Sequence, residues 1–476
     1  MSRPITTADT PPSREGAWWG ANLLDRQPAQ QLWASGWSDV TWEQLRQEVA
    51  GLSRELADHG IGVNSTVALR CPPSFTVVWL LLALWSRGSQ VVLLDPRLKP
   101  QEIERILEHT RAEYTISAET SAESLKPFHD TCQFTVESRA SGVRTDDDVC
   151  LVLCSSGTTG TPKLIGRTPR HLMADLDRHA RNPGMVRTGE RAFLLASPVH
   201  GFGLACGVLH ALNVGATLVF PHSLQPDELV RRARESRVNA ILGVPAHFAL
   251  LSQATGTDPV SVLRLAISCG DVLSAGIRQR FYHRFGVPLG QIYGMSEVGA
   301  IASDLTGACQ PPAVGRLLPG VEGRCDDGEL YIKVDRSPYL RSDRDDRYTD
   351  GWLRTFDRCE IDPGSGELRL MGRTDSVVTV GGLKVDLTEV EAVLREHPQV
   401  IDALLVHGVA AGQAAPGPVL EAHVTGDASL TADSLVRWCR ERLSDFKIPK
   451  RIHVGVDLPR NANGKRLRVH PAEDQT

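Results

Sequence analysis

Short apolar segments recur through the first two thirds of the chain, and the stretches between them are long enough for helices. Four of the segments are typical of buried strands: QVVLLD (90–95), ATLVFP (216–221), NAILGVP (239–245) and RLAISCG (264–270). We also expect a strand over 67–70 and an apolar helix over 75–85. Buried strands that alternate with helices predict α/β layers with largely parallel sheets, because helices cover such sheets on both faces.

The pattern changes after about residue 320. Short alternating segments then lie between turn residues, which predicts a β-rich subdomain: GELYIKV (328–334), GWLRTFDRCEID (351–362) and GELRLMGR (366–373). A chain of 476 residues is too long to fold around one ordinary hydrophobic core. We therefore predict an α/β fold with a large N-terminal domain over residues 1–373, built of two layered sheets plus the β-rich subdomain. Residues 374–476, with a helix over 387–398, would form a small mobile α+β domain.

Charge and cysteine usage exclude several classes of protein. The formal net charge is -5 and no basic tract occurs, so we expect no nucleic-acid partner. The ten cysteines include no C-x-x-C pair, which favours buried thiols in a reducing compartment. The N-terminus lacks an apolar signal segment, and the most apolar run, 77–85, is too short to span a bilayer. We expect a soluble, cytoplasmic protein.

One loop has the composition of an anion site. In LVLCSSGTTGTPKLIGRT (151–168), an expected strand leads into hydroxyls and glycines, and we expect a polar helix to start after them. Glycines admit backbone N–H groups close to a phosphate, hydroxyls add donors and Lys163 adds charge. It is not a Walker loop, because Lys163 follows Pro162 and precedes Leu164. A plain surface loop is the alternative.

Three other stretches carry candidate residues: QIYGMSEVG (291–299), GRTDSVVTVGGLKVDLTEVE (372–391) and PRNANGKRLR (459–468). Tyr293 could stack on a base and Glu297 could hold a metal ion, although this pair of residues alone is a weak signal. Together with SSGTTGTPK, and in this order, the stretches resemble the adenylate-forming superfamily of acyl- and aryl-CoA synthetases, peptide-synthetase adenylation domains and luciferases. The resemblance covers nearly the whole chain.

The resemblance implies that a carboxylate attacks ATP to give an acyl-adenylate, and that a thiol then displaces AMP. It implies catalytic roles for Lys163, Glu297 (with Mg²⁺) and Lys465, the closing lysine near the α-phosphorus. The implied phosphate-binding residues are Ser155, Ser156, Gly157, Thr158, Thr159, Gly160 and Lys163. The implied nucleotide-binding residues are Gly270, Asp271, Val272, Tyr293, Gly294, Met295, Ser296, Asp357 (on the ribose) and Arg373.

The resemblance also implies a hinge at Asp375, about which the C-terminal domain rotates between the two steps. Gly381, Gly382 and Lys384 would then line a channel for the incoming thiol arm.

The segment around His200 resembles benzoate-type aryl-CoA ligases, in which this position gates the acid pocket. No acidic residue lies between Arg191 and Pro226, and a buried substrate ammonium without a partner is costly. We therefore expect an aryl or other compact acid rather than an α-amino acid. The pocket candidates are His200, Phe202, Gly203, His247, Ser268 and Cys269, with Gly294 and Met295, and the small residues would leave room for a ring. A core histidine bonded to backbone is the alternative for His200.

Several alternatives stay open at this point. The acceptor thiol belongs to coenzyme A or to the phosphopantetheine of a free-standing carrier protein. A different second step, such as amide formation or oxidation, would share the first half-reaction, and a catalytically weak nucleotide-binding module is the alternative of another class. The chain also departs from the family pattern, with Phe356 in place of the usual glycine before Asp357, and Thr168-Pro169 in place of Thr-His. Ser296-Glu297 replaces Thr-Glu and keeps the hydroxyl.

Overall fold

The computed structural model describes residues 18–118, 127–145, 147–155, 163–256, 259–270, 273, 275–340, 347–373, 377–409 and 418–455. Some predicted site residues lie outside these ranges: 156–160 of the phosphate loop, Asp271, Val272, Asp375 and Lys465.

The first sheet has the strand order β6-β5-β3-β4-β7-β8. Its central strands are parallel, as predicted: β3 (Thr66–Arg70), β4 (Gln90–Leu94), β5 (Tyr114–Ala118) and β7 (Leu151–Ser155). The edge strands β6 (Phe134–Ser138) and β8 (Lys163–Arg167) are antiparallel to their neighbours. α3 (Phe75–Ser86) is buried from Phe75 to Trp85, which confirms the expected apolar helix.

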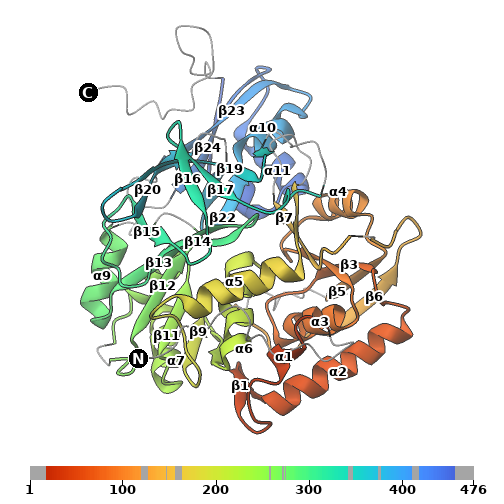
Figure 1. Cartoon of the computed structure of the whole chain (residues 1–476). Coiled ribbons are helices and arrows are strands. Elements are labelled where there is room, and N and C mark those ends of the chain that lie inside the picture. The colour runs from red at the N-terminus through yellow and green to blue at the C-terminus, as the bar shows by residue number, and fades with distance from the viewer. Residues whose placement is uncertain are drawn as a thin grey trace.

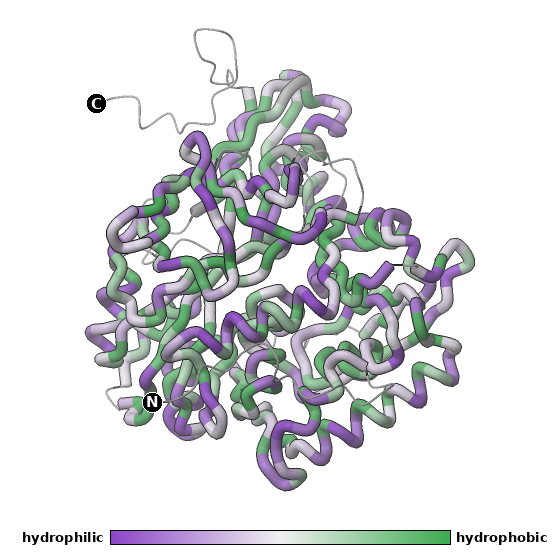
Figure 2. Tube along the Cα trace, in the orientation of Figure 1, coloured by the Kyte–Doolittle hydropathy of each residue, from purple (hydrophilic) through white to green (hydrophobic). Residues whose placement is uncertain are grey.

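The helices around this sheet differ in how much of their surface is buried. α2 (Trp42–Asp58) packs against α3 and buries one side, and Figure 2 shows hydrophobic and hydrophilic residues alternating along it. α4 (Pro100–Thr110) lies at the upper edge of this layer, beside the C-terminal part of the chain (Figure 1). In the described part of the chain, no helix is both long and apolar enough to cross a membrane.

The second sheet begins with a run of parallel strands in the order β1-β10-β9-β11-β12-β13, and β2 (Asp39–Thr41) pairs antiparallel with β1. The strands are β1 (Leu32–Ser35), β9 (Arg191–Leu194), β10 (Thr217–Val219), β11 (Ala240–Gly243), β12 (Leu265–Cys269) and β13 (Leu289–Met295). The associated helices are α1 (Ala21–Leu24), α5 (Pro169–Arg181), η2 (Gly203–Leu209), α6 (His210–Val214), α7 (Pro226–Glu235), α8 (Pro245–Leu251) and α9 (Ala275–Phe285). The strands predicted from apolar segments are thus confirmed.

The predicted β-rich strands continue this second sheet rather than forming a separate one. They run antiparallel outward from β13 in the order β14-β15-β20-β19-β17-β16, and β18 pairs with β19. Their bounds are β14 (Gly299–Asp304), β15 (Ala313–Leu317), β16 (Gly323–Asp326), β17 (Glu329–Lys333), β18 (Tyr348–Thr349), β19 (Trp352–Ile361) and β20 (Glu367–Arg373).

The C-terminal unit, defined as the described residues between 377 and 455, has its own α+β core. Its elements are β21 (Val377–Val380), β22 (Leu383–Asp386), α10 (Leu387–Arg395), β23 (Val400–Val409), β24 (Pro418–Gly426), α11 (Ala432–Arg442), η4 (Asp445–Lys447) and β25 (Arg451–Val454). Val390, Leu405 and Leu435 are among the buried residues that join its helices to its sheet. The fold class is as predicted, and the division at residues 373 and 374 stays a prediction.

One expectation about the phosphate loop is wrong. The chain after the loop enters strand β8, not a helix, and pairs antiparallel with β7 from Ser155–Lys163 to Leu151–Arg167. All five residues of β8 are buried, which suits an edge strand covered by its surroundings better than a polar helix. Helix α5 begins only at Pro169, where the Thr168 hydroxyl accepts a hydrogen bond from the His171 N–H. The loop therefore gains no helix dipole from its own C-terminal side.

Candidate active site

Glu297, which follows β13, is a buried carboxylate surrounded by donors and cations. The Tyr339 hydroxyl donates to its Oε1 at 3.0 Å, and Arg347 Nη1 lies 3.5 Å from the same oxygen. Burial raises the pKa of Glu297, but the charges of Lys384, Arg347 and Lys163, with a backbone hydrogen bond, outweigh it and lower the pKa. Glu297 is therefore ionised at neutral pH.

The structure thus brings together three residues from distant predicted motifs. Lys163 begins strand β8 and is 7% exposed, and its charge acts on Glu297. Lys384 of strand β22 acts both on Glu297 and on the Cys269 thiol at the end of β12. The lysine that follows the predicted phosphate loop, the predicted metal ligand and the lysine of the predicted thiol channel therefore act on one another in one place.

A buried network of charged residues, which the sequence did not indicate, contacts the turn that carries Glu297. Arg167 of β8 donates to the Ser296 carbonyl at 3.2 Å and lies 3.8 Å from the Asp175 carboxylate on α5. Asp175 in turn accepts the Ala300 N–H at 3.1 Å. The network fixes the Ser296-Glu297 turn against the first sheet and α5. Neither Arg167 nor Asp175 belongs to a recognisable motif, so only their burial identifies them.

Three of the predicted nucleotide residues, Tyr293, Asp357 and Arg373, also lie together. The Tyr293 hydroxyl donates to Asp357 Oδ2, and the Asp357 N–H donates to Thr355 Oγ1 at 3.0 Å. Arg373 is the directly opposed partner of Asp357 in the β19–β20 register. A base-stacking tyrosine and a ribose-binding carboxylate require this proximity.

Phe356, which replaces the usual glycine, has a φ of 65°. This left-handed conformation is unfavourable for a side chain with a Cβ atom. Its ring lies under two guanidinium groups, 4.7 Å from Arg347 and 4.4 Å from Arg354. Arg347 therefore contacts Phe356, Tyr339 and Glu297 at once. The sequence did not predict this central position, because Arg347 lies in a charged segment without a recognisable motif.

His200 has side-chain partners at the end of strand β4. Its Nε2 lies 3.3 Å from Asp95 Oδ2 and 3.2 Å from Arg97 Nη2, and its side chain is 37% exposed. These contacts argue against a core histidine bonded to backbone. Burial raises the pKa of Asp95, but hydrogen bonds and charge from His200 and Arg97 outweigh it and hold the pKa well below its usual range. A DPR sequence directly after an apolar strand was the signal available for Asp95 and Arg97.

The other pocket candidates divide into lining and packing residues. The Ser268 hydroxyl is fully buried, and no partner for it lies among the residues that the structure describes. Burial raises the pKa of Cys269 to about 12, so it is a neutral thiol. His247 Nδ1 accepts the Val244 N–H at 3.2 Å, and burial lowers its pKa to about 4, so it is a neutral helix cap.

Two glycines do not leave the expected room for a ring. A Cβ at Gly203 would lie 2.0 Å from the Ser197 carbonyl oxygen, and one at Gly294 would lie 2.5 Å from the Gly299 carbonyl oxygen. In each case neighbouring backbone occupies the space that a side chain would need. Phe202 ends the turn before η2, and Met295 is buried in the core of the β-rich region.

The β21–β22 turn reaches this site from the C-terminal unit. A Cβ at Gly382 would lie 3.2 Å from Val244 Cγ1, and one at Gly270 would lie 3.9 Å from the Gly382 carbonyl oxygen. The predicted channel residues therefore lie against the ends of β11 and β12, next to the pocket candidates.

A second contact holds the C-terminal unit against α4. Glu102 of α4 accepts a hydrogen bond from Ser444 Oγ at 2.6 Å and an ion pair from Lys447 Nζ at 2.7 Å. Lys447 also lies 2.9 Å from Glu389 within its own unit. Lys99 pairs with Asp445 at 3.3 Å, and Arg97, the partner of His200, lies 5.3 Å above the Phe446 ring. Contacts of the C-terminal unit thus reach Arg97, which contacts His200 and Asp95.

Comparison with known proteins gives a consistent result. The model of the AMP-binding enzyme family matches residues 22–333, and that of the AMP-binding enzyme C-terminal domain matches residues 389–465. The p-hydroxybenzoic acid–AMP ligase of Mycobacterium tuberculosis is 26% identical over 92% of this chain and 67% of its own length. The 4-chlorobenzoate–CoA ligase of an Arthrobacter species is 26% identical over 89% of this chain and 88% of its own.

Solved structures show the same fold. The o-succinylbenzoate CoA synthetase of Bacillus subtilis superposes with a TM-score of 0.81 at 22% identity, covering 95% of this chain and 97% of its own. The amide bond synthetase of Marinactinospora thermotolerans superposes with a TM-score of 0.79 at 24% identity, covering 95% and 98%. The family model matches more than half of the chain, and the two relatives named above are ligases of benzoate-type acids. The protein therefore belongs to the AMP-binding enzyme family and is an AMP-forming acid–thiol ligase.

Proposed function

We propose that the protein activates an aryl or other compact carboxylic acid with ATP and transfers the acyl group to the thiol of a phosphopantetheine arm. The observation that carries the proposal is the position of the β21–β22 turn. Gly382 of that turn lies against Val244, and Lys384, in the strand that follows, acts electrostatically on Cys269 and Glu297, where an activated acid would meet a thiol.

In the first step a substrate carboxylate oxygen attacks the α-phosphorus of ATP, and the bond to the pyrophosphate oxygen breaks. Lys163 offsets the charge of the departing phosphates, and Tyr293 and Asp357 orient the nucleoside. Glu297 is ionised and buried, so it suits a Mg²⁺ ion, with phosphate and water supplying the remaining oxygens. Mg²⁺ would supply Lewis-acid stabilisation of the phosphate charge. Lys465 would stabilise the α-phosphate in the same step.

In the second step the thiol sulfur attacks the acyl carbon, the acyl–phosphate C–O bond breaks, and AMP leaves with the bonding electrons. The thiol proton is released to solvent. The ammonium of Lys384, near Cys269 and Glu297, favours the phosphate charge that this step releases. The backbone of Gly381 and Gly382 would border the arm, because neither residue carries a side chain of its own.

The chemistry of the predicted pocket residues favours an uncharged ring over an α-amino acid. Ser268, Cys269 and His247 present a hydroxyl, a thiol and a neutral imidazole. The acid beside His200 is Asp95, which is already engaged by His200 and Arg97. A substrate ammonium would therefore lack a carboxylate partner at this edge of the pocket, which is costly.

Exchange of labelled pyrophosphate into ATP tests the first step. We expect exchange with benzoate-type acids and little with α-amino acids, across a panel that also includes fatty and β-amino acids. Exchange with α-amino acids alone would contradict the proposed substrate class. Coenzyme A, a carrier protein bearing phosphopantetheine, and simple amines are then offered to the same acyl-adenylate. Transfer to amines alone would replace the thiol acceptor with an amide-forming one.

Two substitutions separate the half-reactions. Lys465→Ala should abolish most pyrophosphate exchange while sparing thioester formation from a supplied acyl-adenylate, and equal loss in both would refute its assignment. Asp375→Pro should keep exchange but stall thioester formation, because a proline restricts the hinge. An unaffected second step in that variant would reject the hinge.

A further inference from the structure

The sheet of the C-terminal unit carries polar side chains on the face that points away from its core. Leu420, Ala422 and Val424 of β24 are buried in the core of the unit, so the alternating residues Glu421 and His423 lie on the opposite face. Strand β25 is parallel to β24, and its residue His453 is directly opposed to His423. Two imidazoles and one carboxylate therefore gather on one patch of two neighbouring strands.

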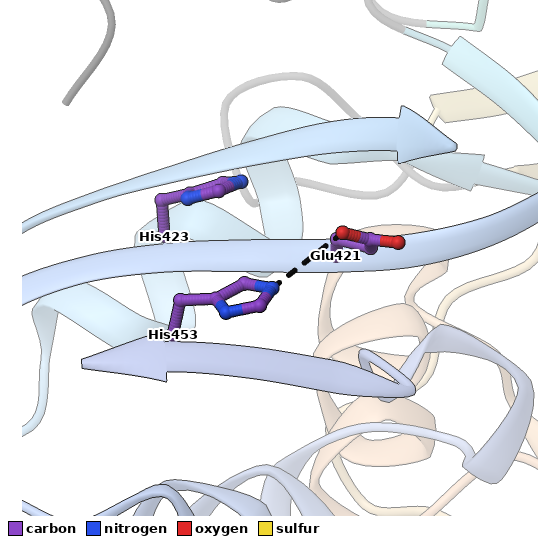
Figure 3. Close-up of side chains that lie close together, drawn as sticks. All are labelled: Glu421, His423 and His453. Carbon is purple, nitrogen blue, oxygen red and sulfur yellow. Dashed lines mark ion pairs between the residues drawn. The ribbon is translucent and has the colours of Figure 1, made fainter. Parts of the chain in front are cut away.

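The donor atoms of these three residues are close together. One ligand atom from each of Glu421, His423 and His453 lies within 4.8 Å of the other two. His453 Nε2 is 3.5 Å from Glu421 Oε2, and the two imidazole rings stack with centroids 4.9 Å apart and an interplanar angle of 21°. Figure 3 shows the three side chains side by side, with the His453 nitrogen facing the carboxylate.

We propose that Glu421, His423 and His453 bind a Zn²⁺ ion or a similar borderline divalent cation. Two histidines and a carboxylate are a donor set that Zn²⁺ favours, whereas Mg²⁺ favours oxygen donors only. In a tetrahedral zinc site, donors about 2.0–2.1 Å from the metal are about 3.3 Å apart. The separation of 3.5 Å between His453 and Glu421 is close to that value, and the His423 donor atom lies within 4.8 Å of both.

The surroundings suit a bound cation. Glu421 is 3% exposed, and Arg451 Nη1 donates to its Oε1 at 2.6 Å. Arg451 thereby fixes the orientation of the carboxylate, as an outer-shell partner does, with Oε2 facing His453. His453 is exposed, so a water molecule has access to the fourth position. A simple Glu421–His453 ion pair is the competing account.

The ion would connect β24 to β25, the last described strand before the sequence that contains Lys465. This site is separate from the nucleotide and acid sites, because its ligands lie on strands that contribute none of the residues described there. Its role would be structural, bracing the unit whose position the proposed reaction changes.

The test is a calorimetric titration of chelator-treated full-length protein with ZnCl₂, without nucleotide. We expect one equivalent of Zn²⁺ to bind, with affinity at least about tenfold lower in His453→Gln. Because His453 is exposed, this variant should fold, which circular dichroism checks. His59→Gln, an exposed histidine on α2's C-terminal end, is the matched control and should bind as the wild type does.

Cobalt provides a second readout, since Co²⁺ in a tetrahedral nitrogen and oxygen site absorbs strongly in the visible. The absorption should appear in the wild type and in His59→Gln, and should be lost in His453→Gln. Absence of stoichiometric Zn²⁺ binding would overturn the proposal. Unchanged Zn²⁺ binding in His453→Gln would also overturn it and direct attention to the cysteines instead.

Discussion

At the scale of single residues, Phe356 shows how a side chain offsets an unfavourable backbone. Its φ of 65° costs about 1 kcal/mol in a residue with a Cβ atom, while Arg347 and Arg354 each contribute a cation–π contact. Because Arg347 also approaches Glu297, the aromatic ring helps to hold a guanidinium beside the predicted catalytic carboxylate.

Two substitutions at Phe356 should separate the energetic cost of its backbone conformation from the contribution of its aromatic ring. Phe356→Ala keeps the unfavourable φ and loses the ring, whereas Phe356→Gly loses both. We expect Phe356→Gly to be more stable than Phe356→Ala by about 1 kcal/mol in urea unfolding. An alanine variant as stable as the glycine variant would show that the backbone relaxes when the ring is removed.

His247 should make stability depend on acid pH. Burial lowers its pKa to about 4, so the folded state takes up a proton at lower pH than the unfolded chain does. Stability is therefore lost as pH falls from about 6.5 towards about 4. His247→Gln keeps a side chain that caps α8 but does not titrate.

Urea unfolding at pH 7.5 and pH 5 measures this contribution. The wild type should lose about 2 kcal/mol more than His247→Gln between the two pH values. His59→Gln serves as the exposed control and should follow the wild type. Equal losses in the wild type and in His247→Gln would mean that His247 does not control the acid sensitivity.

At the scale of elements, α4 and η4 are joined by a buried cluster of three charges. Burial lowers the pKa of Lys447, but Glu389 and Glu102 outweigh it and raise the pKa, so the ammonium stays charged. Burial, opposed by Lys447, raises the pKa of Glu389. Glu102 joins the C-terminal unit to α4, whereas Glu389 pairs with Lys447 inside the unit.

Neutralising the two carboxylates should therefore have unequal effects. Glu102→Gln removes the ion pair between α4 and the C-terminal unit but leaves Lys447 paired with Glu389. We expect thioester formation from a supplied acyl-adenylate to fall about tenfold, a change of about 1.4 kcal/mol, with pyrophosphate exchange retained. In Glu389→Gln, Lys447 keeps its ion pair with Glu102, so thioester formation should fall less. A loss in Glu389→Gln as large as in Glu102→Gln would argue against a role in docking.

At the scale of the whole molecule, the site is assembled from both ends of the chain. The β21–β22 turn meets the ends of β11 and β12 through Gly382, while η4 meets α4 through Lys447 and Glu102. The position of the C-terminal unit therefore determines which residues face the acid pocket. A change confined to this contact should alter transfer without altering the fold of either part.

Gly382→Ala and Gly381→Ala form a matched pair for this purpose. Both glycines have positive φ, 81° and 59°, so alanine costs similar backbone energy at each. Only the Gly382 methyl meets Val244, at 3.2 Å, while nothing lies within 4 Å of the Gly381 methyl. We expect thioester formation to be roughly threefold to tenfold slower in Gly382→Ala than in Gly381→Ala. Equal rates would mean that the turn does not approach Val244 during transfer.

The limits of sequence-based prediction follow from the same contacts. The apolar strands, α3 and α10 were predictable because their patterns lie within a few consecutive residues. Strand β8 was not, because KLIGR (163–167) is too short to distinguish a buried edge strand from a helix start. Tyr293 and Asp357 were assigned from motifs, but Arg347, Arg167 and Asp175 carry no motif and become recognisable only as buried partners.

The sequence by itself determined the family, the α/β class and the order of the motifs, since each depends on local residue patterns that any fold of this chain would retain. Only the tertiary structure decided that Glu297 lies between Arg347 and Tyr339, and that Lys447 pairs with Glu102, 345 residues earlier in the chain. Such pairs depend on how layers pack against each other. Their energies come from burial and charge shared between distant segments, which no short stretch of sequence encodes.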